Sequence, residues 1–386
     1  MSSGARTASS PPFTAAHEAL RARMRGWIAS ELRPHAPSWE RAGSFPDSVF
    51  GALAAQGWLG LKYGPAADWV ADAVLCEELA RCGSGGVAAG IGAHVGIATP
   101  PIARFGTEWQ RERWLVPAIR GEAIGALAIT EPDAGSDVAS LRTRAVPVDG
   151  GWLVSGAKTF ITNGVRASFY LTAVRTGGAG HGGISFLVIE RGDGVRASPL
   201  RKLGWRASDT AELAFDEVFV PAEHLLGELD RGFALIMANF QWERLLMALG
   251  AVGAMRRGVE EAVAGLPSRP GGYGGAARAA VAELAVRAET GAALTYHALR
   301  RFLDWREAGE AAGDEAFGRG SAVREVTMAK LLTQRASFEV AESVLALLGP
   351  DDAGERERAV RDARLGPIGG GTDEIMREIL GRMLVG

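Results

Sequence analysis

The chain has 386 residues, which at about 150 residues per domain is enough for two or three domains. Its 42 basic and 45 acidic residues leave a net charge of −3, so a nucleic acid or an anionic membrane is not expected as a partner. A hydrophobic content of 47% excludes a largely disordered chain. No apolar run approaches the ~18 residues of a spanning helix, and two cysteines are too few for a disulfide framework or a thiolate metal site.

The first zone, residues 13–122, has helical periodicity after a Ser/Ala/Pro-rich start. Residues 1–12 lack the apolar core of a signal peptide, which predicts a frayed tail on a cytoplasmic protein. Thr107 and Gln110 have the spacing of a capping box and predict a helix that runs to Ile119. Two more helices are predicted in this zone, at 47–57 and 69–82.

The middle zone, residues 123–228, changes to the two-residue period of strands, and the last zone, 229–386, returns to helices. The turn at Asp149-Gly150-Gly151 predicts a hairpin. Three more strands are predicted at 169–174, 184–189 and 211–220, and four helices at 231–266, 276–308, 321–348 and 372–384. The chain is therefore expected to be mainly helical, with a central β-barrel or sandwich domain and a C-terminal four-helix bundle.

A lone carboxylate interrupts the most apolar helix. Between Arg231 and Arg256 the only charged residues are Glu243 and Arg244, and Glu243 shares an apolar stripe at helical spacing. Burial raises a carboxyl pKa, whereas a neighbouring guanidinium lowers it. The residues alone leave two interpretations open: a catalytic carboxylate, or a buried Glu–Arg pair that only fixes helix packing.

Three polar or glycine-rich segments are candidates for ligand binding. The string Leu127-Ala-Ile-Thr-Glu-Pro-Asp-Ala-Gly-Ser-Asp137 ends a β-run in a turn with exposed N–H groups and hydroxyls. In 156–164 an aromatic and a threonine can flank a planar ligand. In 367–375 three glycines lead into a helix start, which favours anions and polarised carbonyls.

Together these segments resemble the acyl-CoA dehydrogenase family over nearly the whole chain. The Ala-Ile-Thr-Glu-Pro-Asp-Ala-Gly-Ser-Asp string, the 156–164 segment, the segment that begins Lys202-Leu-Gly-Trp-Arg, and the Gly-Gly-Thr-Asp-Glu-Ile near the end follow one another in the family order. The resemblance implies an FAD enzyme that forms a double bond between Cα and Cβ of an acyl thioester. A base takes the α proton and flavin N5 takes the β hydride.

The resemblance also implies which residues act. The family places its base either before the terminal Gly-Thr, here Gly370, which has no side chain, or in a Glu-Arg-Leu string, here Glu243. That is the arrangement of isovaleryl- and long-chain-type members. The Gly370 N–H is expected to hold the thioester carbonyl. Substrate contacts are expected from Ser136, Arg244 and Gly371, and flavin contacts from Leu127, Ile129, Thr130, Gly135, Ser136, Phe160, Thr162, Arg269, Thr372 and Glu374.

Two flavin elements of the family are altered here. The family has Arg-x-x-Phe-Gly and a downstream Gln that bind FAD across a dimer interface, whereas this chain has only Arg269 in a glycine-rich segment. The Gly-Gly-x-Gly-Phe/Tyr element becomes 348–354, where Asp351 and Asp352 are expected to repel a pyrophosphate. These departures predict a divergent branch that retains FAD less firmly.

The expected partners are an acyl-CoA or acyl-carrier-protein substrate, an electron-transferring flavoprotein or oxygen as acceptor, and a second or further copies in a homodimer or homotetramer. No metal is expected. Two alternatives stay open: a flavin monooxygenase or oxidase on the same scaffold, and a flavin-poor, non-catalytic subunit. A retained Glu243 argues against the first, and the altered flavin elements favour the second.

Overall fold

The computed structural model describes residues 12–266, 274–312 and 322–385. The chain divides into two compact units. The helical unit contains residues 1–37, 68–85 and 241–386, and the sheet unit contains 38–67 and 86–240. Part of the N-terminal helical zone thus packs with the C-terminal helices, which the sequence alone does not indicate.

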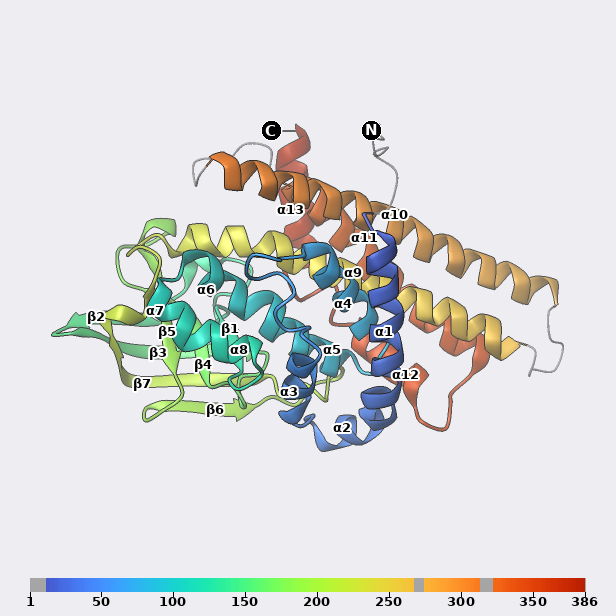
Figure 1. Ribbon diagram of the computed structural model, residues 1–386, viewed down its shortest axis with the longest axis horizontal. Helices are drawn as coiled ribbons and strands as arrows, with labels where there is room; N and C mark the ends of the chain where they lie inside the picture. The colour runs from blue at the N-terminus through green and yellow to red at the C-terminus, as the bar shows by residue number, and fades with distance from the viewer. Residues whose placement is uncertain (1–11, 267–273, 313–321, 386) are drawn as a thin grey trace. The chain divides into compact units, whose positions relative to one another are not determined.

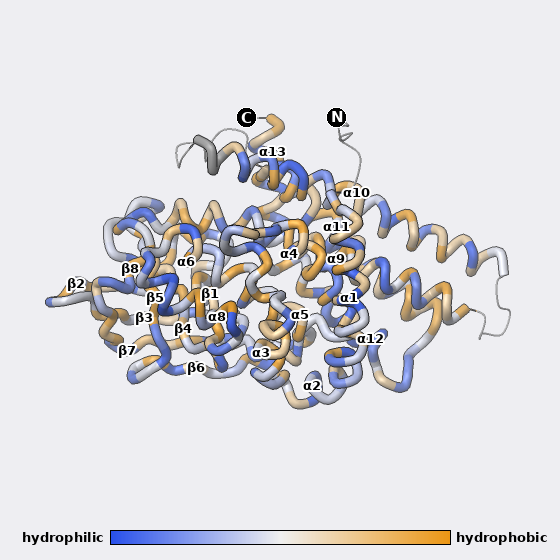
Figure 2. Tube along the Cα trace, viewed as in Figure 1, coloured by the Kyte–Doolittle hydropathy of each residue, from blue (hydrophilic) through white to orange (hydrophobic). Residues whose placement is uncertain are grey.

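The helical unit is built on one apolar core shared by helices that lie far apart in the sequence. Its helices are α1 (Ala15–Glu31), α4 (Trp69–Leu79), most of α9 (Gly232–Gly265), α10 (Gly275–Ala312), α11 (Val323–Leu348), α12 (Glu355–Ala363) and α13 (Asp373–Val385). The core takes Ala73 from α4, Leu249 from α9, Leu299 from α10 and Val326 from α11. Orange stretches along these helices in Figure 2 mark the apolar residues that form it.

The sheet unit contains one eight-stranded sheet with the order β6-β7-β3-β2-β4-β5-β8, in which β1 pairs parallel to β4. Its strands are β1 (Gly125–Ala128), β2 (Arg144–Val148), β3 (Gly151–Ile161), β4 (Phe169–Arg175), β5 (Ile184–Glu190), β6 (Val195–Pro199), β7 (Ala211–Pro221) and β8 (Leu225–Leu226). Alternate residues of β4 and β5 enter two different clusters: Leu171 and Phe186 lie in one, and Tyr170 and Leu187 lie in the other. The sheet is therefore buried on both faces in this region.

Helices cover the first of these faces, as Figure 1 shows for α6, α7 and α8 beside β1, β4 and β5. Ile102, Trp114 and Ala118 from this helical layer pack in the same cluster as the strand residues Leu171 and Phe186. The helices of the sheet unit are α2 (Ala36–Ala42), α3 (Ser48–Ala55), α5 (Gly85–Gly92), α6 (Thr99–Phe105), α7 (Glu108–Gln110) and α8 (Val116–Ile119), with π-helical turns at Ala93–Ala98 and Arg111–Leu115.

Most predicted elements are confirmed to within a few residues. Thr107 forms the predicted capping box with Gln110, and the hairpin of β2 and β3 turns at Asp149 and Gly150. Two elements were not predicted: the edge strand β6 and the helix α12. Both are short and polar, so neither has the apolar pattern from which strands and helices are recognised.

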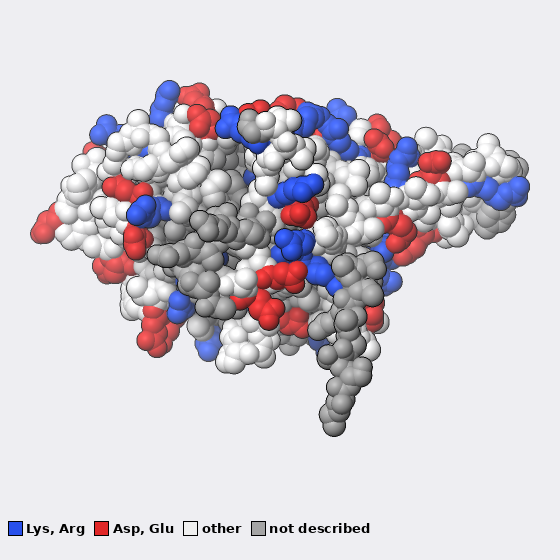
Figure 3. All heavy atoms as spheres, turned by 90° about the horizontal axis from the view of Figure 1, so that it is seen from above, with Lys and Arg blue, Asp and Glu red and all other residues white. Residues whose placement is uncertain are grey.

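The prediction that no apolar run has the length of a spanning helix needs correction. The continuous helical segment Gly85–Phe105 has 21 residues and a mean hydropathy of 1.2, so by length and composition it passes the test for a membrane span. Within its most apolar window, 67% is buried inside the structure, as in a core helix. On the face drawn in Figure 3, acidic and basic side chains of the described residues are interspersed.

Candidate active site

The first candidate segment follows strand β1 and is held by a buried ion pair. Lys158 on β3 donates to Ile129 O at 3.0 Å and to Glu131 Oε1 at 2.8 Å. The Glu131 carboxylate also accepts from the Thr143 backbone N–H at 2.9 Å. Burial lowers the pKa of Lys158 to about 8, although Glu131 opposes this, while Lys158 helps to lower the pKa of Glu131 against the effect of burial. The chain direction after β1 is therefore fixed from inside the sheet.

This anchor leaves the polar residues of the turn exposed. Backbone hydrogen bonds between Glu131 and Ala134 close the turn, and Gly135 and Ser136 follow it at the surface. A Cβ placed on Gly135 lies 3.6 Å from Thr130 Cγ2, an ordinary contact, so no protein atom blocks the approach to this backbone. The turn offers N–H groups and hydroxyls to a ligand, as its sequence indicates.

The second segment lies beside the first and presents an aromatic ring. Thr159 N donates to Thr130 O at 2.9 Å, which joins β3 to the residue after Ile129. The next residue, Phe160, has a φ of 59° in a register shift of the β3–β7 ladder, and 68% of it is exposed. Such a bulge turns a side chain out of the regular alternation. A large exposed ring next to Thr130, with Thr162 two residues further on, suits a planar ligand.

The third segment, in the helical unit, contains the lone carboxylate. Glu243 lies on α9 and is half-buried, and its Oε2 has no hydrogen-bond partner among the described residues. Burial raises the pKa of Glu243 to about 7, against the opposing charges of Arg244 and Lys330. Arg244 is buried and its Nη1 donates to Thr327 Oγ1 at 3.5 Å. A carboxyl group with a pKa near neutrality and a free oxygen can accept a proton at physiological pH.

The terminal glycine loop lies against the same part of α9. Gly370 and Gly371 have φ values of 63° and 96°, a region that favours glycine. A Cβ placed on Gly370 lies 3.8 Å from Glu243 Oε1 and 2.5 Å from Met247 Sδ. The structure thus brings together the two positions at which a base was considered, and shows that Met247 covers the one without a side chain.

The loop leads into α13 as predicted. Thr372 Oγ1 accepts from Ile375 N at 3.3 Å, which caps the helix, and Asp373 N donates to Pro367 O at 2.9 Å. Glu374 is exposed and forms an ion pair with Arg377 at 3.5 Å. Thr372 and Glu374 therefore lie at the helix start that follows the glycines.

Two residues named for the FAD phosphates have different outcomes. Arg269 lies outside the described residues. The Asp351 carboxylate accepts from the backbone N–H groups of Ala353, Glu355 and Arg356 at 2.8–3.0 Å, which lowers its pKa against the effect of burial. Asp351 thus begins α12, a role that the sequence analysis did not assign to it.

Four residues next to these segments were missed. Met247 covers Gly370, and Thr327, Lys330 and Gln334 of α11 contact residues of α9 or of the glycine loop. One signal was available: Lys330 is one of only four lysines and lies in the apolar run Met-Ala-Lys-Leu-Leu. A charge in such a run must be paired or functional.

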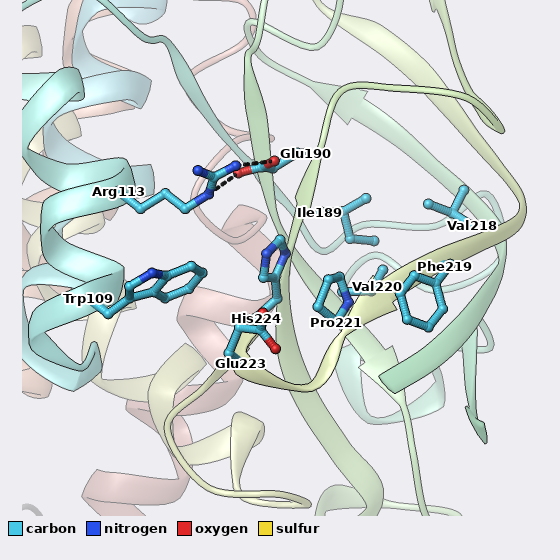
Figure 4. A pocket seen from close by; sticks show the side chains of 10 residues that line it. All are labelled: Trp109, Arg113, Ile189, Glu190, Val218, Phe219, Val220, Pro221, Glu223 and His224. Atoms are coloured by element: carbon cyan, nitrogen blue, oxygen red, sulfur yellow. Dashed lines mark hydrogen bonds and ion pairs between the residues drawn. The ribbon is translucent and has the colours of Figure 1, made fainter. Parts of the chain in front are cut away.

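A separate cavity of about 380 Å³ lies in the sheet unit, lined among others by Trp109, Arg113, Glu190 and His224. Figure 4 shows its two polar groups engaged with neighbours: Arg113 pairs with Glu190 at 2.7 Å, and His224 Nδ1 bonds Val188 O at 2.9 Å. None of the predicted site residues lines this cavity. Its polar side chains are satisfied within the protein, and we assign it no function.

Comparison with known proteins identifies the family. Three family models match in order: the N-terminal domain of acyl-CoA dehydrogenase at 14–122, its middle domain at 126–218 and its C-terminal domain at 230–385. The chain belongs to the acyl-CoA dehydrogenase family. An acyl-CoA dehydrogenase of Bacillus subtilis (strain 168) is 32% identical over 95% of this chain and 97% of its own length.

Solved structures agree with this assignment. A probable acyl-CoA dehydrogenase from Mycobacterium abscessus is 37% identical, with a TM-score of 0.88 over 96% of this chain and 99% of its own. An acyl-CoA dehydrogenase complexed with FAD from Bacillus anthracis is 26% identical, with a TM-score of 0.89 over 98% of this chain and 68% of its own. The chain is thus an oxidoreductase that acts on CH–CH groups, with the helical, β and helical domains of its family and FAD as cofactor.

The residues present in the sheet unit fit this cofactor. The exposed Phe160 ring beside Thr130 suits the flavin ring system, and the open turn at Gly135 and Ser136 offers N–H groups and a hydroxyl. Leu127 is half-buried and Ile129 is buried, so their side chains support this surface from behind. Thr162 is half-buried next to Asn163, which donates to Gly90 O at 2.8 Å.

Proposed function

We propose that the protein removes two hydrogens from Cα and Cβ of an acyl thioester, with Glu243 as the base. One observation carries the proposal: a half-buried carboxylate with a pKa near 7 lies 3.8 Å from the Cβ position of Gly370, in the terminal loop. Because Gly370 has no side chain, Glu243 supplies the carboxylate of this region. A packing role alone does not explain an oxygen without a hydrogen-bond partner among the described residues.

The base performs the proton half of the reaction. Glu243, once ionised, accepts the α proton of the thioester, and bound FAD supplies the acceptor for the β hydride, so that a Cα–Cβ double bond forms. The Gly370 N–H donates to the thioester carbonyl, where negative charge develops. Arg244, buried beside Glu243, opposes the rise of its pKa and keeps the carboxylate ionised closer to neutral pH.

The finer features of the reaction are part of the proposal. We assign Ser136, Arg244 and Gly371 to the thioester, and Thr130, Phe160, Thr162, Thr372 and Glu374 to the flavin. The acyl group is carried by coenzyme A or an acyl carrier protein. Electrons leave to an electron-transferring flavoprotein or to oxygen, and the protein works in the cytoplasm as a homodimer or homotetramer.

Replacement of Glu243 by Gln tests the base. The amide is nearly isosteric and cannot accept the proton, so anaerobic flavin reduction by an acyl-CoA panel should slow by at least ~10²–10⁴-fold, with FAD still bound. Glu342→Gln, which removes an exposed carboxylate on α11, is the matched control and should reduce flavin at the wild-type rate. Near wild-type flavin reduction in Glu243→Gln would remove Glu243 from the mechanism.

The same experiment separates the alternative activities. In a dehydrogenase the flavin bleaches with an acyl thioester in the absence of oxygen. A monooxygenase or oxidase of this scaffold needs no α-proton base, so its flavin chemistry would not respond to Glu243→Gln. A non-catalytic subunit would show no bleaching with any thioester of the panel.

A further inference from the structure

One face of helix α11 carries three buried polar residues, and each contacts the candidate active site. Thr327, Lys330 and Gln334 are three and then four residues apart, so they lie on one side of the helix. All three are buried, which is unfavourable for polar groups unless they are hydrogen-bonded. Each has its partner in the site: Thr327 contacts Arg244, Lys330 donates to Gly371 O, and Gln334 donates to Met247 O.

Lys330 has the contact with the most direct consequence. Its Nζ donates to Gly371 O at 2.7 Å, and its side chain is fully buried. Gly370 and Gly371 lack Cβ atoms and have positive φ values, so their own conformational preferences do not fix this loop. A hydrogen bond to the Gly371 carbonyl fixes the backbone directly after the amide of Gly370. Met247 packs over the same glycine.

The choice of lysine at this position is informative. Nearly all basic residues of the chain are arginine, and lysine occurs only at positions 62, 158, 202 and 330. A lysine ammonium is a compact charge that can donate to one carbonyl in a confined space, whereas the planar guanidinium of arginine needs more room. Lys158 does the same in the sheet unit, where it is fully buried and donates to Ile129 O.

We infer that Lys330 is a positioning residue of the dehydrogenation: its ammonium fastens the Gly370–Gly371 loop beside Glu243 and places a positive charge near that carboxylate. The inference rests on the proposed role of Glu243. It assigns Lys330 no contact with the substrate or the flavin.

The charges around Lys330 determine what its removal does. Asp373 Oδ1 lies 3.8 Å from Nζ, and Glu243, Arg244 and Glu374 also act on Lys330 through their charges. Burial lowers the pKa of Lys330 to about 8, which Asp373 opposes, so the residue is mostly protonated at pH 7. The positive charge of Lys330 lowers the pKa of Glu243. Without it, Glu243 must hold its proton to a higher pH, because the carboxylate loses one of its two stabilising charges.

The test compares Lys330→Met with Arg335→Met in the FAD-loaded enzyme. Both residues pair with Asp373, Arg335 at 2.6 Å, but of the two only Lys330 donates to Gly371 O. Anaerobic flavin reduction is measured from pH 6 to 9 with the thioester that reduces wild type fastest. Lys330→Met should be at least ~10-fold slower at its plateau, because a displaced donor loses alignment with the carbonyl, and its acid limb should move to higher pH.

Two further variants separate geometry from charge. Lys330→Gln keeps a donor and loses the charge, so its acid limb should move as in Lys330→Met with a smaller loss of rate. Lys330→Arg keeps the charge in a larger group, so its rate should fall while the limb stays near that of wild type. Arg335→Met should leave the limb unmoved. If Lys330→Met does not fold, Lys330→Gln alone decides by the position of its limb.

An unmoved acid limb in Lys330→Met and Lys330→Gln would overturn the inference, as would an equal shift in Arg335→Met. Failure of the base assignment is recognised separately, since Glu243→Gln would then reduce flavin at the wild-type rate. A second readout does not need turnover: crotonyl-CoA, a 2-enoyl thioester, is titrated by the change in flavin absorbance. Its Kd should rise at least ~10-fold in Lys330→Met and stay at the wild-type value in Arg335→Met. Equal Kd values in wild type and Lys330→Met would also overturn the inference.

Discussion

Moving the base from α9 to the terminal loop tests the geometry of the site. The two positions are close, since Glu243 Oε1 lies 3.8 Å from a Cβ placed on Gly370, so a carboxylate at 370 should reach the same substrate carbon. The sequence suggests that Glu243→Gln combined with Gly370→Glu restores some activity. The structure corrects this expectation, because the new Cβ would stand 2.5 Å from Met247 Sδ.

The size of the conflict follows from ordinary contact distances. Non-bonded heavy atoms settle at about 3.5–4.0 Å, so the loop or Met247 must move by roughly 1 Å. A displacement of that size near the reacting groups costs up to about 10²-fold in rate. The φ of 63° at position 370 adds about 1–2 kcal/mol for any residue with a Cβ. The double variant should therefore stay close to the rate of Glu243→Gln and melt at a lower temperature.

Removing the obstacle should reveal the second base position. In the triple variant with Met247→Ala, the space of the thioether receives the new side chain, and we expect flavin reduction at least ~10-fold faster than in Glu243→Gln. Glu243→Gln combined with Met247→Ala is the control and should gain nothing. Anaerobic stopped-flow absorbance measures the rates, and bound FAD and the melting temperature are checked for each variant.

Two outcomes would refute this reasoning. If the double variant is as fast as the triple one, Met247 does not obstruct position 370. If the triple variant folds, binds FAD and gains nothing, the two positions do not face the same carbon of the substrate.

Three more predictions use the same assays. Arg244→Ala should lower unfolding stability by up to ~3–5 kcal/mol, because Glu243 loses a charge partner in a buried setting, and should move the acid limb of kcat/KM above the wild-type position near pH 7; an unchanged melt and limb would show that Arg244 is dispensable. Lys158→Met should leave Glu131 buried without its cation and release FAD more readily, measured by flavin fluorescence after dilution, and FAD retention equal to wild type would count against the anchor. FAD should be sub-stoichiometric after purification and leave faster still in Arg269→Ala, because lost contacts at ~1 kcal/mol each weaken binding by one to two decades; stoichiometric FAD indifferent to this change would contradict the expectation.

The sequence predicts much of the fold because local and tertiary preferences agree in the long elements. The strands β4, β5 and β7 have clear patterns and begin at the predicted residues or next to them. Thr107 caps its helix because its hydroxyl and the Gln110 side chain satisfy each other's backbone N–H groups, a local arrangement visible in four residues. In such segments the pattern contains the information that the structure uses.

Contacts between distant segments are a different matter. The 2.5 Å approach of Met247 Sδ to the Cβ position of Gly370 joins residues more than a hundred positions apart, and Met247 looks in sequence like any apolar residue of α9. Asp351 was expected to act on a phosphate because a resemblance compares positions, whereas its carboxylate bonds the first N–H groups of α12. Neither role is visible before the chain is folded.

The polar stripe of α11 lies between these two cases and shows what sequence analysis can recover. The spacing of Thr327, Lys330 and Gln334 is visible in the sequence, and a lysine within an apolar helix is costly to bury without a partner. The partner, Gly371 O, is supplied by a glycine loop that follows α11 in the chain and cannot hold its own conformation. A chain with a lone carboxylate on one buried helix and a lone lysine on another should therefore be examined for a flexible loop to which the lysine donates, because that loop and the carboxylate then meet at the reacting group.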